Sequence, residues 1–74
     1  MLIRIENNIN QLEALKLPPE HKEQFNFNYT KQQLLTKFST FKQYYSDGVN
    51  PNALKHIINE LEQEVEQLCQ QFNS

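Results

Sequence analysis

The most regular stretch of the chain is NPNALKHIINELEQEVEQLCQQF, residues 50–72. Its apolar side chains recur at alternating intervals of four and three residues, at Leu54, Ile58, Leu61, Val65, Leu68 and Phe72. This spacing places them on one face of a helix and is typical of a packed heptad seam. Asn50 and Pro51 suit the N-cap and the first helical position. The stretch therefore predicts a helix over about 51–72 with one buried face.

A second amphipathic stretch comes directly before this helix. Its apolar residues are spaced by four, three and four positions, at Leu34, Phe38, Phe41 and Tyr45. This pattern predicts a helix over about 30–46. Thr30 and Gln33 fit a reciprocal capping pair at its start, and Gly48 can take the left-handed conformation at its end. Because only residues 47–50 connect the two helices, we expect them to pack as an antiparallel hairpin.

The two helices are expected to share one apolar seam. We assign this structural seam to Leu34, Phe38, Phe41, Leu54, Ile58, Leu61, Val65 and Leu68. Charges agree with the pairing, since residues 28–46 carry lysines and no acid, while residues 59–74 carry glutamates and no base. Surface ion pairs of this kind stabilise a fold by only about 0–1 kcal/mol each. They can still set the orientation of one helix against the other.

An additional helix is predicted near the N-terminus, over about 2–16. Its apolar face comprises Leu2, Ile5, Ile9 and Leu12. Pro18 and Pro19 end it, because the residue before a proline disfavours helical angles. Residues 17–29 form the connection, in which Phe25, Phe27 and Tyr29 alternate with asparagines. That alternation indicates an extended loop whose aromatic side chains cap the core. The fold class is all-α, in a single small domain over residues 1–74.

Composition excludes several classes of protein. Of the 74 residues, 38% are hydrophobic and 22% are charged, and the net charge is −2. There is no run of about 18 apolar residues, so we expect no membrane span. There is no basic stripe, so we expect no nucleic-acid partner. One cysteine excludes an intramolecular disulfide framework, and the absence of a secretory-type start predicts a cytoplasmic protein.

No group of residues predicts catalysis, a cofactor or a metal site. His56 and Glu60 stand at i and i+4, but two ligands are fewer than the four of a structural metal site. Cys69 lies near a helix C-terminus with Glu66 close by, which opposes formation of a reactive thiolate. Gly48 is the only glycine, so no glycine-rich phosphate loop exists. We therefore expect neither an enzyme nor a cofactor.

The apolar stripes are wider than a hairpin can bury. Ile57 lies beside the seam and Tyr44 lies off it. Either the first helix or another chain must cover this surface, because a domain of this size has a thin core of its own. Candidate partner-binding residues are Ile5, Ile9, Tyr44, Tyr45 and Ile57.

A Gly-x-x-Pro turn, Gly48-Val49-Asn50-Pro51, joins the two amphipathic helices, and Leu54, Ile58 and Leu61 follow it. In these features the chain resembles the small co-chaperones of bacterial type III secretion needle subunits, the YscE/PscE/EscE-like group. The resemblance covers residues 34–72. It implies a hairpin that binds a larger helical-repeat chaperone and, with it, keeps the needle subunit monomeric in the cytoplasm before export. The alternatives are a small helical regulator of a signalling or transcription protein, and a self-associating homo-oligomeric adaptor.

Overall fold

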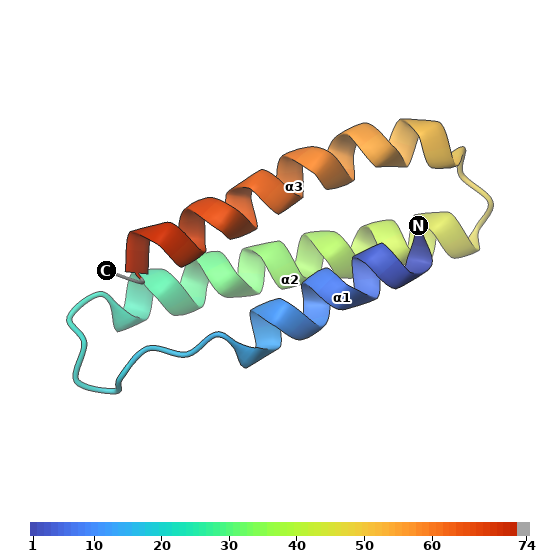
Figure 1. Cartoon of the computed structure of the whole chain (residues 1–74). Coiled ribbons are helices and arrows are strands. Elements are labelled where there is room, and N and C mark those ends of the chain that lie inside the picture. Colours follow the sequence, from blue (N-terminus) through green and yellow to red (C-terminus); the bar gives the residue numbers. More distant parts are fainter. Residues whose placement is uncertain (73–74) are drawn as a thin grey trace.

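The computed structural model describes residues 1–72, which form three α-helices and no strand. Helix α1 spans Leu2–Ala14, α2 spans Gln24–Ser46 and α3 spans Pro51–Phe72. The helices lie side by side in an elongated bundle of 43 × 17 × 17 Å (Figure 1). The predicted all-α class is therefore confirmed for the described residues, and so is a helix near the N-terminus.

The bundle has two distinct ends, a turn end and a loop end. The start of α1, the last residues of α2 and the start of α3 lie together at the turn end (Figure 1). The loop of residues 15–23 and the C-terminal end of α3 lie at the opposite, loop end. Helix α2 packs against both other helices. It is therefore the central element of the bundle.

Helix α2 ends as its sequence predicts. Gly48 has φ +89°, in the left-handed region that a Cβ disfavours. The Gly48 N–H donates to the carbonyl oxygen of Tyr45 at 3.1 Å, and the Val49 N–H donates to that of Tyr44 at 3.0 Å. These two bonds make the Schellman arrangement, which satisfies carbonyls that the helix itself leaves open.

The start of α3 also follows the prediction. The side-chain Oδ1 of Asn50 accepts a hydrogen bond from the backbone N–H of Asn52 at 2.9 Å, as an N-cap does. Pro51 occupies the first helical position, where its missing N–H removes no helical bond. Residues of the turn at 47–50 therefore cap both helices: Gly48 ends α2, and Asn50 begins α3.

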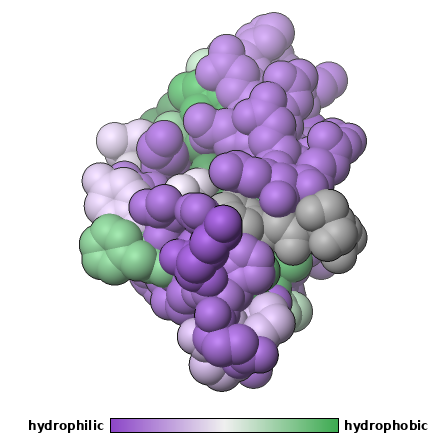
Figure 2. Space-filling view, turned by 90° about the vertical axis from the view of Figure 1, so that its left-hand side faces the viewer, coloured by the Kyte–Doolittle hydropathy of each residue, from purple (hydrophilic) through white to green (hydrophobic). Residues whose placement is uncertain are grey.

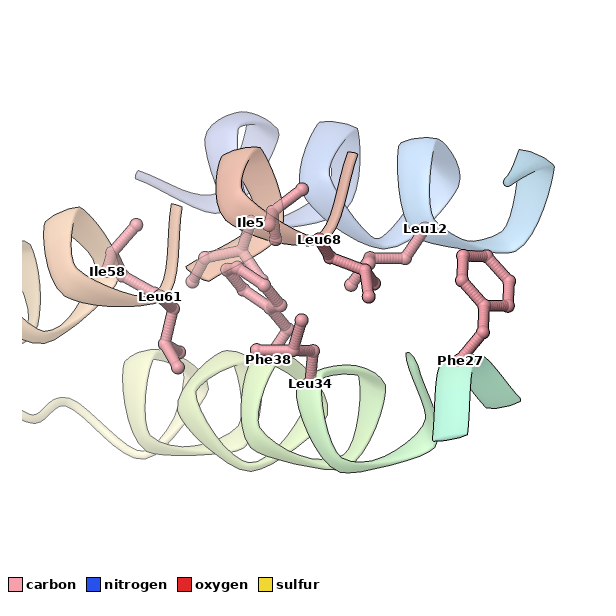
Figure 3. Packing of buried hydrophobic residues seen from close by; sticks show 9 residues of the cluster. Ile5, Leu12, Phe27, Leu34, Phe38, Ile58, Leu61 and Leu68 are labelled. Atoms are coloured by element: carbon pink, nitrogen blue, oxygen red, sulfur yellow. The ribbon is translucent and has the colours of Figure 1, made fainter. Parts of the chain in front are cut away.

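The start of α2 differs from the prediction. The helix begins at Gln24, so the expected extended loop over 25–29 is wrong, and Thr30 lies inside the helix rather than at its N-cap. Phe27 lies one heptad before Leu34, so it continues the buried face of α2 and packs beneath the C-terminal end of α1 (Figure 3). This burial favours helix over the extended form that alternating asparagines suggested. Helix α1 ends at Ala14, earlier than the expected 16.

The core draws on all three helices, whose side chains converge along the bundle axis (Figure 3). Seven of the eight predicted seam residues are buried: Leu34, Phe38, Leu54, Ile58, Leu61, Val65 and Leu68. Phe41 is half-buried and packs against them. The side chain of Phe72, expected on the same seam, lies outside the described residues. Ile5 and Leu12 of α1 are fully buried in the same cluster, so α1 is an integral part of the core.

Candidate protein-binding surface

The predicted partner-binding residues occupy different environments. Ile5 is 0% exposed, so its assignment to a partner surface is wrong: helix α1 packs on the rest of the bundle and uses Ile5 as core. Ile9 and Ile57 are half-buried and pack against the core cluster. Tyr45 is also half-buried. Tyr44 is 44% exposed and remains available to another molecule.

Three exposed apolar side chains belong to elements that meet at the turn end. Tyr44 comes from the last turn of α2, Val49 from the turn itself and Ile3, 73% exposed, from the first turn of α1. The ring of Tyr44 packs edge-on against that of Phe41, with ring centroids 5.6 Å apart. Such a contact holds the Tyr44 ring in one orientation at the surface. Of these three exposed residues the sequence indicated only Tyr44 as a binding residue, and its ring is the one that packs against Phe41.

Two exposed aromatic residues lie toward the loop end. Phe25, 79% exposed, and Tyr29 project from the first turns of α2 into solvent. Their exposure follows from the extended start of that helix, because Phe27 alone of the three aromatic residues turns inward. Most of the surface seen from this end is hydrophilic, with separate hydrophobic areas (Figure 2). The expected role of Phe25 and Tyr29 as caps over the core is wrong.

A polar cluster connects α1 to α3. Arg4 Nε donates to Glu62 Oε2 at 2.9 Å, and the Arg4 guanidinium also pairs with Glu62 Oε1 and with Asn59. Asn8, which is buried, donates from Nδ2 to Glu62 Oε2 at 2.8 Å and to the Arg4 carbonyl at 2.9 Å. The bidentate geometry and the added amide satisfy the carboxylate, which is partly removed from water.

This cluster shifts the ionisation of both charged members. The hydrogen bond from Arg4 lowers the pKa of Glu62, and Asn8 lowers it further, against the opposing effect of burial. The same bond to Glu62 raises the pKa of Arg4. Arg4, Asn8 and Glu62 join α1 to α3, and they line an open hollow together with Met1, Ile3, Asn7 and Gln11.

Further ion pairs run along the flanks of α2. Lys37 Nζ lies 4.0 Å from Glu64 Oε2 of α3, which agrees with the charge pattern of the sequence. Lys42 Nζ instead lies 3.3 Å from Glu6 Oε1 of α1. Lys31 Nζ donates to the carbonyl oxygen of Leu15 at 2.8 Å, so this lysine ties α2 to the end of α1.

Among residues 1–72, no three His, Cys, Asp or Glu side chains stand close enough together to hold a metal ion. Cys69 is half-buried at the edge of the core, and His56 is exposed on α3. The groove between α2 and α3 is lined by amide, hydroxyl and charged side chains around Leu34 and Leu68. Over residues 1–72, no helix combines the length and apolarity needed to cross a bilayer.

Comparison of the chain with protein-family models, curated proteins and solved structures finds no match.

Proposed function

We propose that this chain is a small protein-binding co-chaperone, which docks a larger helical-repeat chaperone and helps keep a type III secretion needle subunit monomeric in the cytoplasm. The observation that carries the binding role is the exposure of Tyr44 at the turn end, where Val49 and Ile3 are also exposed. The ring of Tyr44 is held by Phe41 at the surface, and tyrosine is among the residue types that anchor protein interfaces. The resemblance around Gly48–Pro51 supplies the class of partner.

We also infer that α2 and α3 form the antiparallel hairpin that this class of co-chaperone requires. The ion pair between Lys37 and Glu64 supports the inference, and so does the groove that residues 30–37 of α2 and residues 64–71 of α3 line together. In Figure 1, α2 runs toward the turn at residues 47–50 and α3 runs back from it. The short turn at 47–50 allows the same geometry.

The chemical logic of the proposal rests on exposed apolar surface. A helical subunit that polymerises carries an apolar strip that must be covered before export. Aromatic residues at the turn end can anchor a groove formed by helical repeats, since tyrosine contributes a large contact area and a polar tip. The half-buried Tyr45 and Ile57 would border this contact without leaving the core.

The first experiment is a tagged pull-down from the native cell, with the captured chains identified by mass spectrometry. We expect stoichiometric recovery of a helical-repeat chaperone together with a needle-like small protein. The variant Tyr44→Ala should reduce recovery at least about tenfold, since truncation of an aromatic anchor costs about 2 kcal/mol or more of binding energy.

Tyr29→Ala is the matched control, because Tyr29 is also an exposed tyrosine of α2 but lies toward the loop end. It should leave recovery unchanged. Absence of any helical-repeat chaperone from the wild-type pull-down would contradict the co-chaperone function. Loss of binding with Tyr29→Ala but not with Tyr44→Ala would show that the docking surface does not lie at the turn end.

A further inference from the structure

The turn that ends α2 holds the one aspartate and the one glycine of the sequence side by side, at Asp47 and Gly48. Both residues are exposed to solvent. In such a pair the backbone nitrogen of the glycine can attack the side-chain carboxyl carbon of the aspartate, because glycine has no side chain to shield that nitrogen. The space around Gly48 is open as well, since an added Cβ would meet no atom within 4 Å. The pair is therefore a candidate for covalent modification.

The modification needs no reagent other than water. First, the Gly48 nitrogen bonds to the side-chain carbonyl carbon of Asp47 and gives up its proton, and a carboxyl oxygen leaves as water. The product is a five-membered succinimide ring. Water then adds to one of the two ring carbonyls. Cleavage of the bond to the side-chain carbonyl restores aspartate, whereas cleavage of the bond to the main-chain carbonyl leaves isoaspartate, whose main chain runs through Cβ.

The folded turn holds the attacking nitrogen away from the carboxyl group. The ψ angle of Asp47 is −1°, so the Gly48 nitrogen eclipses the backbone nitrogen of Asp47. Ring closure instead requires it to eclipse the Asp47 Cβ, because both atoms belong to the ring that forms. The Gly48 N–H also donates to the carbonyl oxygen of Tyr45 at 3.1 Å. Rotation about ψ toward the reactive arrangement therefore breaks the bond that ends α2.

The carboxyl group of Asp47 is held as well. Gln43 Nε2 donates to Asp47 Oδ1 at 3.0 Å, which ties the carboxylate to the preceding turn of α2. Side-chain pairs at this spacing of four residues stabilise a helix slightly. Both reacting groups must therefore be released from α2 before they can meet.

We propose that Asp47–Gly48 is a site of spontaneous isomerisation to isoaspartate, and that the hydrogen bonds of the turn set its rate. The reaction proceeds from molecules in which the last turn of α2 has opened locally. Isoaspartate lengthens the main chain, so the N–H groups of Gly48 and Val49 no longer match the carbonyls that they bond in the folded turn. The change is independent of the proposed co-chaperone function, and either can fail without the other.

Storage of the purified full chain in native buffer and in guanidinium chloride tests the proposal. A lysine-specific protease releases residues 43–55, because Lys42 and Lys55 flank the turn. Isoaspartate gives a second chromatographic form of this peptide at unchanged mass, which an isoaspartyl methyltransferase methylates. Deamidation of Asn50 or Asn52 would instead change the mass. We expect isoaspartate in both solutions, formed at least about tenfold faster in guanidinium chloride, where the bonds of the turn are lost.

Gln43→Met tests the contribution of the side-chain bond. Methionine has a helix propensity close to that of glutamine but cannot donate to Asp47. The variant should isomerise up to about twofold faster in native buffer, and at the wild-type rate in guanidinium chloride. Gln32→Met is the control, since it makes the same change at an exposed site of α2 far from the turn, and it should have no effect.

The proposal is overturned if isoaspartate is absent from both solutions, or if it forms at equal rates in the two. An equal change of rate with both methionine variants would show that the bond between Gln43 and Asp47 does not protect the site.

Discussion

Glu62 illustrates what single residues contribute to this bundle and what a sequence hides. In the sequence it is one of four glutamates on a helix, spaced around the surface. In the structure it accepts hydrogen bonds from Arg4 and from Asn8, whose positions are more than 50 residues away. No sequence feature near Glu62 identifies Arg4 and Asn8 as its partners, because the contact depends on the register of α1 against α3. The cluster could therefore not be predicted from the residues alone.

Glu62 should make the stability of the protein depend on pH. Its pKa is lowered in the folded state, so its ionised form favours folding at pH values above the unfolded pKa of about 4.3. That contribution is lost as the pH falls through the lower, folded-state pKa. Glu62→Gln should therefore lower the free energy of unfolding at pH 7 by about 1–2 kcal/mol and flatten its dependence on acid. Urea unfolding at several pH values measures both effects.

Glu60→Gln is the matched control for this experiment, since Glu60 is an exposed glutamate of the same helix. It removes the same charge without touching the cluster. An equal loss of stability with both variants at pH 7 would show that net charge, and not the contact with Arg4, controls the effect.

At the scale of helices, prediction succeeded where caps and periodicity agree. The start of α3 has both an N-cap and a regular apolar face, and it was predicted at the correct residue. The start of α2 has a weaker signal, since its N-cap, Glu23, makes no capping bond through its side chain. The spacing of Phe27, Leu34 and Phe41 by seven residues was available in the sequence. The alternation of three aromatic residues with asparagines obscured it.

Gly48 provides a test of the α2–α3 turn. An added Cβ at this position would meet open space, so the effect of Gly48→Ala comes from the positive φ alone. We expect Gly48→Ala to destabilise the fold by about 1–2 kcal/mol. Gly48→Asn should lower the free energy of unfolding by less, because asparagine tolerates the left-handed region better than alanine does. Equal melting temperatures for all three proteins would contradict the role of the backbone conformation.

At the scale of the whole molecule, the main correction concerns α1. The sequence assigned the seam to two helices, named Ile5 and Ile9 as partner-binding candidates, and left open whether α1 or another chain covers the hairpin. In the structure, Ile5 and Leu12 are fully buried, and Glu6 and Arg4 form ion pairs with α2 and α3. The pattern of the first helix correctly predicted which of its faces is buried, but not which elements cover that face. The covering elements depend on how all three helices are placed, and periodicity does not encode that placement.

Two isoleucines of α1 test whether this helix stabilises the bundle. Ile5→Ala should reduce the free energy of unfolding by about 2–4 kcal/mol, because it removes buried methylene groups and leaves a cavity. Ile3→Ala makes the same chemical change on the same helix at an exposed site and should stay within about 0.5 kcal/mol of wild type. Thermal and chemical unfolding measure the difference. Similar values for the two variants would mean that α1 is not part of the cooperative unit.

The turn at residues 47–50 also bears on the order in which the chain folds. Both of its caps are made by residues close in sequence, so it can form before any distant contact. Closing this short connection loses less chain entropy than closing the longer loop of residues 15–23. We expect α2 and α3 to pair in the folding transition state and α1 to dock afterwards. Gly48→Ala would then slow folding, whereas Ile5→Ala would mainly accelerate unfolding.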